Sequence, residues 1–396
     1  MTKADKEGQR KAPILRFKGF TDDWEQRKLG EIGKTYSGLS GKNKSDFEKG
    51  NSNFVTFLEV LNNPVLKNID LTNKVEIKEN EHQNKVKRND ILFNTSSETP
   101  EEVATSTVVD VNQNNLYLNS FCFGFRPNVQ FSNYYIGYYL RSNHFRSRVF
   151  CLAQGISRYN ISKKSLIKLK LSLPKLEEQD KISRIFNQIE LLLTLYEKKK
   201  QLLTQLKQGI VNFLITKNGQ KPQLRFSGFN NNWESKSFEK LLNYEQPTKY
   251  IVKKADYISQ GTPVLTANKS FVLGYTNETN VYQNIPAIIF DDFTLESKYV
   301  DFPFMVKSSA IKILTSENSN LFFIYQLLNN QRFVQEGHSR HYISVVQKKK
   351  VLVPSIQEQN KISDLIKQLE DNIELNSNTI VLLKKLKEFL LQSMFL

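Results

Sequence analysis

The chain has 396 residues, more than one hydrophobic core usually holds, so two or more domains are expected. Lys and Arg number 56 against 40 Asp and Glu, and the formal charge of +16 favours a polyanionic partner, with nucleic acid first among the candidates. No segment has the roughly 18 uninterrupted apolar residues of a membrane span, and the opening residues lack the apolar run of a signal peptide. We therefore expect a soluble, cytoplasmic protein that makes no membrane contact.

A first internal repeat begins each half of the chain. PILRFKGFTDDWE at residues 13–25 returns as PQLRFSGFNNNWE at residues 222–234, with eight identities in thirteen positions at a constant offset of 209. The identical residues include Arg16 and Trp24. Repeats of this kind fix the order of parts before any secondary structure is assigned.

A second repeat ends each half. LSLPKLEEQDKIS at 171–183 returns as VLVPSIQEQNKIS at 351–363 with an offset of 180, and just upstream GISRYNIS at 155–162 matches GHSRHYIS at 337–344. The order of parts is therefore domain, helix, domain, helix. The predicted boundaries are 1–173 for the first domain, 174–217 for the central helix, 218–353 for the second domain and 354–396 for the distal helix.

Within each domain, short β-rich runs alternate with polar turns, which indicates an α+β fold. The predicted strands lie at residues 53–60, 90–94, 117–125, 262–266 and 287–290. Amphipathic helices are predicted at residues 132–150 and 319–335.

The second repeat leads into two long helices. Pro174 and Pro354 mark their starts, and Glu178 and Glu358 fall in the first turn, where a carboxylate favours the positive end of the helix dipole. A helix of about 39 residues is roughly 58 Å long at ~1.5 Å per residue.

Apolar residues recur along both helices at steps of three and four, the pattern of a coiled-coil seam. The predicted seam comprises Ile182, Ile185, Ile189, Leu192, Tyr196, Leu203, Leu206, Ile210 and Phe213 in the first helix and Ile362, Ile366, Leu369, Ile373, Asn376, Ile380, Leu383, Leu386 and Leu390 in the second. Asn376 either sets the register of the seam or is solvated on a slightly rotated face.

Neither stripe can be buried alone, so we expect the two helices to pack against each other. The chain connectivity favours an antiparallel pair, with the two domains at opposite ends and related by a pseudo-twofold axis. By that symmetry, residues 13–32 should lie beside the end of the second helix, near Leu396.

The basic residues are concentrated in the second part of each domain. Residues 111–173 contain nine Lys or Arg and no Asp or Glu, and residues 302–353 contain seven basic residues against two acidic ones. In the first of these segments, candidates for contacts to phosphates and bases are Arg141, Arg146, Arg148, Arg158, Lys163 and Lys164, with Tyr134, Tyr135, Tyr138, Tyr139 and Tyr159 among them. The alternative is a solvated basic surface around ordinary core tyrosines.

The two repeats and the order of parts resemble the specificity subunits of type I restriction-modification enzymes over nearly the whole chain. The resemblance implies that residues of about 13–173 and 222–353 are target recognition domains, each reading one half of a split, asymmetric sequence in double-stranded DNA. It implies that the helices are conserved spacer regions that bind two methyltransferase subunits and, through them, two restriction subunits. S-adenosylmethionine, ATP and Mg would belong to those partners, and this chain would hold no cofactor and perform no catalysis.

The same resemblance suggests that polar loops after a strand face DNA, here residues 94–99 and 291–294. Further candidate DNA-binding residues, in these loops and in the other basic turns, are Lys42, Lys44, Thr95, Ser96, Asp292, Thr294, His338, Arg340, His341, Lys348 and Lys349.

The sequence contains few motifs that indicate a catalytic, cofactor or metal site in this chain. The turn at residues 38–43 has too few residues between its glycines for a phosphate-binding loop, and no Asn-Pro-Pro-Tyr or Asp-Pro-Pro-Tyr run of an adenine methyltransferase occurs. His338 and His341 have helical metal-ligand spacing without a third partner, so no metal is expected. Cys122 and Cys151 are expected to be reduced core residues and not a disulfide.

Two other functions stay open. Asp70, Glu76 and Lys78 resemble the set of a magnesium-dependent nuclease, and a stand-alone DNA-binding regulator would need its helices only to hold itself together. Leucines beside or off the seam favour the specificity subunit over the regulator, because they suggest docking surfaces for other subunits. These leucines are Leu191, Leu193, Leu195, Leu202 and Leu214.

Overall fold

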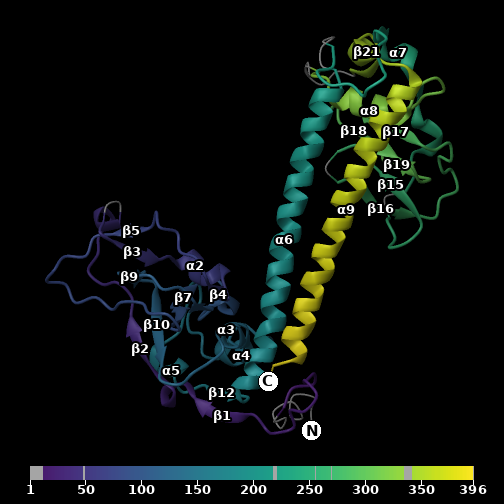
Figure 1. Cartoon of the computed structure of the whole chain (residues 1–396). Helices are drawn as coiled ribbons and strands as arrows, with labels where there is room; N and C mark the ends of the chain where they lie inside the picture. Colours follow the sequence, from purple (N-terminus) through teal and green to yellow (C-terminus); the bar gives the residue numbers. More distant parts are fainter. Residues whose placement is uncertain are drawn as a thin grey trace. The chain divides into compact units, whose positions relative to one another are not determined.

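The computed structural model describes residues 12–47, 50–216, 221–254, 256–268, 270–333 and 341–395. The chain divides into two compact units, unit 1 with residues 1–196 and 378–396, and unit 2 with residues 197–377. Each unit combines a mixed domain of sheets and short helices with part of each long helix, α6 (Leu176–Leu214) and α9 (Ile356–Ser393) (Figure 1). The expected α+β class is confirmed.

The core of the unit 1 domain is built on a five-stranded sheet in the order β2-β10-β6-β8-β4. Its strands are β2 (Gly33–Ser37), β4 (Val65–Leu66), β6 (Ile91–Asn94), β8 (Ser106–Val109) and β10 (Cys122–Pro127). Because side chains alternate between the faces of a strand, Ile91 and Phe93 enter the main core while Leu92 packs into a second cluster behind the sheet. Both faces of the sheet are therefore covered.

Smaller elements surround this sheet. A three-stranded sheet contains β5 (Lys74–Val75), β3 (Ser52–Val55) and β9 (Leu116–Leu118) in that order. The two-stranded pairs join β7 (Ser96–Ser97) to β11 (Tyr159–Asn160) and β1 (Glu25–Lys28) to β12 (Lys170–Leu173).

The strand expected at residues 53–60 is too long. It ends at Val55, and helix α2 (Phe57–Asn62) follows because Thr56 and Glu59 cap each other's backbone N–H groups.

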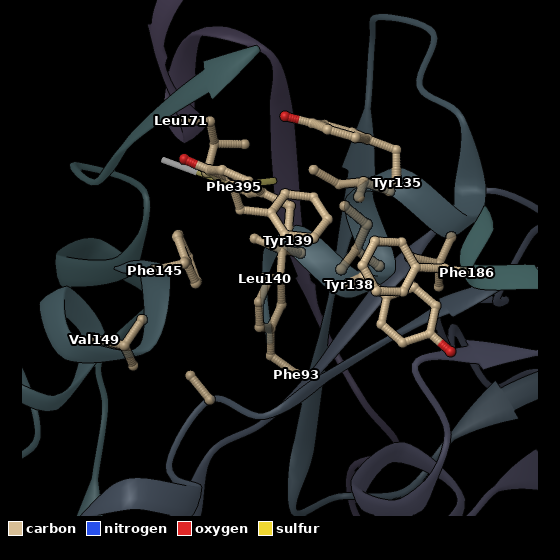
Figure 2. Close-up of a cluster of buried hydrophobic side chains, with 14 of the residues drawn as sticks. Phe93, Tyr135, Tyr138, Tyr139, Leu140, Phe145, Val149, Leu171, Phe186 and Phe395 are labelled. Atoms are coloured by element: carbon tan, nitrogen blue, oxygen red, sulfur yellow. The ribbon is translucent and has the colours of Figure 1, made fainter. Parts of the chain in front are cut away.

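The helix expected at residues 132–150 is divided in two. Helix α3 (Asn133–Tyr139) is separated from α4 (Asn143–Phe150) by Ser142, whose hydroxyl accepts from the N–H of Phe145 and starts the second helix. The short helix α5 (Lys163–Leu166) precedes β12. Tyr135, Tyr138 and Tyr139 of α3 are buried and gather with Phe186 and Phe395 in the core (Figure 2), so the core alternative holds for these three tyrosines.

The unit 2 domain follows the same plan. Its four-stranded sheet has the order β14 (Asn243–Glu245), β20 (Ile311–Thr315), β17 (Ala287–Asp291) and β18 (Ser297–Val300). A three-stranded sheet has the order β16 (Val272–Thr276), β15 (Thr262–Leu265) and β19 (Met305–Val306), and β13 (Glu234–Ser237) pairs with β21 (Lys350–Val353). The helices are α7 (Phe238–Leu241) and α8 (Leu321–Asn329), the latter shorter than the predicted 319–335.

The two long helices run antiparallel within each unit, as expected. In unit 1 the ring of Phe186 lies 5.5 Å from that of Phe395, and four residues later along α6 Glu190 pairs with Lys387, earlier in α9, at 2.5 Å. In unit 2 Lys207 pairs with Glu370 at 2.5 Å.

Most residues of the predicted seam are buried or half-buried, but part of the stripe is misassigned. Leu192, Leu206, Phe213 and Leu386 are 41–51% exposed. On α6 the buried side follows strict alternating steps of four and three from Ile182. Phe186, Leu193 and Leu214 therefore lie in the seam, where the residue just before each of them had been predicted. This stepping also places Lys207 at the seam, where Glu370 neutralises its charge.

Asn376 is 2% exposed, so the solvated alternative for this residue is wrong. Its side-chain amide donates to the carbonyl of Asn372, one turn earlier in the same helix.

Candidate nucleic-acid interface and helix junctions

The two sequence repeats meet at a junction between the domain and the long helix of unit 1. Arg16 donates two hydrogen bonds to Glu178, Nε to Oε1 at 2.7 Å and Nη2 to Oε2 at 2.9 Å, and the carboxylate is only 1% exposed. This hydrogen-bonded carboxylate raises the pKa of Arg16. The N–H of Leu15 donates to the carbonyl of Ser393 at 2.9 Å, which confirms that the N-terminal repeat lies beside the end of α9.

Unit 2 contains the same junction. Arg225 donates to Glu358 through Nε at 2.9 Å and Nη2 at 2.7 Å, again with a carboxylate 1% exposed. The N–H of Leu224 donates to the carbonyl of Phe213, near the end of α6. The repeated Arg and the repeated Glu are therefore a matched pair in each unit.

The other repeated residues complete the junction in unit 1. The amide of Gln179 donates to the carbonyl of Pro174 at 3.0 Å and accepts from the N–H of Ser132 at 3.1 Å. The hydroxyl of Ser183 accepts from the N–H of Tyr135 at 2.8 Å. These bonds satisfy N–H groups at the start of α3, which have no partner within that helix.

In unit 2, Gln359 and Ser363 hold the start of α8 in the same way. Gln359 donates to the carbonyl of Pro354 at 3.0 Å and accepts from the N–H of Asn320 at 2.9 Å, and the Ser363 hydroxyl donates to the Asn320 side chain at 2.9 Å. The repeated Arg, Glu, Gln and Ser residues of these junctions are thus structural connections in both units.

A second pair of junctions was not predicted. In unit 1 Glu190 accepts from the hydroxyl of Tyr138 and from Lys387 of α9. Burial alone would raise the pKa of Glu190, but the hydrogen bonds from Lys387 and Tyr138 outweigh it and lower that pKa.

The unit 2 equivalent is Glu370, which accepts from Gln326 of α8 at 3.3 Å and pairs with Lys207 of α6. The signal was available in the sequence, because Glu190 and Glu370, like Lys207 and Lys387, recur at the offset of 180 that defines the second repeat.

Two arginines that were expected at the DNA surface instead bind backbone carbonyls inside the unit 1 domain. Arg141 donates to the carbonyls of Ser106 and Val60 at 2.8 Å and of Asn63 at 2.9 Å, and burial lowers its pKa to about 10. Arg146 donates to the carbonyls of Glu101, at 2.6 Å, and Val103, and burial lowers its pKa to about 10 as well. Both guanidinium groups are largely buried and donate to backbone carbonyls, which argues against DNA contact.

Arg148 and Lys42 are also engaged within the protein. Arg148 donates to the carbonyl of Lys170 at 2.8 Å, and the largely buried ammonium of Lys42 pairs with Glu81. Lys44 is exposed.

The remaining unit 1 candidates form a surface patch beside the polar loop after β6. Tyr159 belongs to β11, and the N–H of Thr95 donates to the carbonyl of Phe121 at 2.9 Å. Ser96 of the neighbouring β7 is only 7% exposed, so it is not a surface residue, contrary to expectation. Arg158 and Lys164 are exposed, and Lys163 donates to the Ser37 hydroxyl at 2.7 Å. We call the set of Thr95, Phe121, Ile156, Arg158, Tyr159, Lys163 and Lys164 the unit 1 patch.

The unit 2 candidates divide in the same way. Asp292 is buried, accepts from the N–H of Tyr342 at 2.7 Å and lies 3.4 Å from the buried ammonium of Lys312, and His341 is 1% exposed. Asp292 and His341 therefore support the interior, contrary to expectation. Thr294 and Lys348 are exposed and Lys349 is half-buried. His338 and Arg340 lie outside the described residues.

Asp70, the first residue of the set that resembles a nuclease, has a structural role. Asp70 accepts from the N–H and hydroxyl of Thr72 at 2.9 and 2.6 Å, and these bonds lower its pKa, so it stabilises a turn. The residues that the structure describes contain no group of three or more His, Cys, Asp or Glu arranged for a metal ion. Cys122 and Cys151 are unpaired, as expected, but Cys151 is exposed and not a core residue.

Each unit exposes the same three leucine positions on its long helices. Leu195, Leu202 and Leu206 of α6 recur at an offset of 180 as Leu375, Leu382 and Leu386 of α9. All six are 45–65% exposed. Unit 1 holds Leu195, Leu382 and Leu386, and unit 2 holds Leu375, Leu202 and Leu206. Leu191 is exposed as predicted, whereas Leu193 and Leu214 are buried and belong to the seam.

No helix among the described ranges is long and apolar enough to span a bilayer.

The family model of the type I restriction modification DNA specificity domain matches residues 21–205 and 230–385. The chain therefore belongs to this family, and its two matched regions together cover most of the sequence.

Curated relatives have the same description. The specificity subunit of the type I restriction enzyme EcoR124I/EcoR124II from Escherichia coli is 50% identical over 123 residues, which are 29% of this chain and only 30% of that protein. The putative specificity subunit of the type I restriction enzyme MjaX from Methanocaldococcus jannaschii is 24% identical over 293 residues, 66% of this chain and 67% of that protein.

The fold has a solved counterpart. The S subunit of a type I restriction-modification system from M. genitalium superposes with a TM-score of 0.64 at 15% identity, over 97% of this chain and 99% of that one. At this level of identity the similarity concerns the fold.

Proposed function

We propose that the chain is the non-catalytic specificity subunit of a type I restriction-modification complex and reads a bipartite, asymmetric target in double-stranded DNA. The observation that carries the proposal is the combination of two domains of one topology, each fixed to the long helices by the same Arg–Glu pair. Because the two domains are attached to the helices in the same way but differ in their surfaces, each of them can bind a different half-site. We expect the complex to act in the cytoplasm.

Two equivalent leucine surfaces support two copies of one partner. Exposed apolar groups that recur at the same positions in both units suit a repeated docking interaction. We assign these surfaces to two methyltransferase subunits, which would in turn recruit the restriction subunits. S-adenosylmethionine, ATP and Mg would then be bound by those partners.

Methylation profiling tests the proposal directly. Adenine methylation is mapped across the host genome with and without the gene for this chain. We expect one motif of two unequal halves to lose its methylation when the gene is removed. An unchanged methylation map, with the methyltransferase still expressed, would contradict the proposal.

The same assay tests whether the helices set the gap between half-sites. One heptad is inserted within residues 190–210 of α6, with a matching heptad in the facing part of α9 to keep the antiparallel register. The expected result is a longer gap between unchanged half-sites. If the insertion variant methylated sites with the original gap, helix length would not determine the spacing between half-sites.

A further inference from the structure

Ile156 is the most exposed of the large apolar side chains in the described part of the chain, at 95%. It lies in a narrow loop closed by Gln154 and Asn160, whose backbones exchange hydrogen bonds of 2.9 and 2.8 Å. Gly155 has a φ of +133°, and a Cβ there would lie 2.1 Å from the carbonyl oxygen of Arg158, so the turn requires glycine. The loop is therefore built to present Ile156 to the outside.

A cation and an aromatic ring lie close to the loop that presents Ile156. The guanidinium carbon of Arg158 lies 6.0 Å from the ring centroid of Phe121, which is itself 58% exposed. Lys163 and the exposed Lys164 follow in α5. The carboxylate of Glu102 in the neighbouring segment accepts from the Ser97 hydroxyl at 2.7 Å, and the carboxylate of Glu98 is exposed.

An isoleucine in water contributes nothing to the core, and its exposure two residues from Arg158 suits a partner that is anionic outside and apolar inside. Duplex DNA has this character, because its phosphates surround stacked bases. Proteins that bend DNA insert apolar side chains, isoleucine included, between adjacent base pairs. A protein partner with an apolar surface fits less well, since the cations beside Ile156 would then be desolvated without anionic groups to pair with.

We propose that Ile156 is a wedge that enters a base step of the half-site read by unit 1 and partly unstacks it, while Arg158 contacts the adjoining backbone. This inference rests on the proposed function. The aligned segment of the second domain has His338 where the first has Ile156, so this apolar side chain occurs in only one of the two domains.

The test uses the full chain and a duplex with the motif recovered by methylation profiling. 2-Aminopurine replaces single bases through the unit 1 half-site, because its fluorescence rises when its neighbours unstack. Wild type should raise the fluorescence at one step. Ile156→Ala should abolish that rise and weaken binding by roughly 60-fold, the effect of removing three buried apolar carbon groups, and Ile156→Leu should restore both.

Leu71→Ala is the matched control, since Leu71 is 56% exposed in the same unit and lies outside the unit 1 patch. It should bind and unstack the duplex like wild type, and all variants should unfold at the wild-type denaturant concentration. Binding and fluorescence unchanged in Ile156→Ala would overturn the wedge.

Weaker binding of Ile156→Ala with no fluorescence rise in wild type would also overturn the wedge and indicate contact with a thymine methyl group, which uracil substitution would reproduce. If wild type failed to bind the duplex at all, the proposed function itself would fail.

Discussion

Arg16 and Glu178 are 162 residues apart in the chain and form a two-pronged ion pair whose carboxylate is almost completely buried. The pair joins the first segment of the unit 1 domain to the first turn of α6. Its copy in unit 2, Arg225 with Glu358, has the same geometry. The most similar parts of the sequence are therefore the parts that fasten each domain to the helices.

Removing Arg16 should be costly. Arg16→Ala leaves the carboxylate of Glu178 buried without its partner, and truncation of a buried pair typically costs about 3–5 kcal/mol. Urea unfolding of the full chain should show the loss in the transition that reports unit 1. Arg27→Ala is the control, since its 3.7 Å contact with Glu25 is exposed on both sides and should change stability by under about 1 kcal/mol. Equal effects of the two substitutions would contradict a special role for the buried pair.

Glu190 should make the stability of unit 1 depend on pH. Its pKa is lowered in the folded state by Lys387 and Tyr138 against the opposing effect of burial, so its contribution is present above the pKa of an unfolded Glu, about 4.3, and is lost as the pH falls through the folded value. Unfolding measured between pH 6 and 3 should therefore show a smaller loss on acidification for Glu190→Gln than for wild type. Parallel curves for the two proteins would count against the prediction.

Arg158 and Arg141 should separate DNA binding from stability. Arg158→Ala removes an exposed cation of the unit 1 patch, so the affinity for the target duplex should fall and the slope of its logarithm against that of the salt concentration should decrease by about 0.9, the value for one phosphate contact. Arg141→Ala should instead lower stability, because three backbone carbonyls lose their donor. Binding titrations at several salt concentrations and urea unfolding check both, and a reversed result would invalidate the assignment.

The leucine surfaces should be separable by unit. Asp in place of Leu195, Leu382 and Leu386 should remove one of two methyltransferase subunits, because the charges lie at a desolvated contact while unit 2 keeps Leu375, Leu202 and Leu206. Native mass spectrometry of the co-expressed complex measures the stoichiometry. Three Asp residues at Glu197, Lys198 and Gln201, which are exposed polar positions of α6, serve as the control and should leave two copies bound. Loss of both copies, or of neither, would contradict two independent surfaces.

Periodicity explains why the helices could be predicted so well. A proline followed by an acidic first turn marks where α6 and α9 begin, and the repeated apolar spacing shows which side of each helix is buried. Both signals are local and do not depend on distant parts of the chain. The seam was misassigned where leucine stood next to the true position, as at Leu192 beside Leu193. Lys207 broke the apolar pattern, and only its partner Glu370 explains why a lysine is tolerated there.

The DNA-facing residues were harder to predict because charge does not reveal burial. Arg141 and Arg158 look alike in the sequence, yet one binds carbonyls in the interior and the other is exposed. Which cation is internal depends on where free carbonyls occur in the tertiary structure. The same holds for Arg16, whose recurrence signals constraint but does not identify Glu178 as its partner.

Phe395 closes the aromatic core of unit 1, with ring centroids 5.6 Å from Tyr135, 5.9 Å from Tyr139 and 5.5 Å from Phe186. On the ribosome, these three side chains emerge 209 to 260 residues before Phe395. The aromatic core of the unit 1 domain therefore lacks Phe395 until all of unit 2 has been synthesised. Nascent chains of this protein should need protection from aggregation during that interval, although each part alone is of ordinary size.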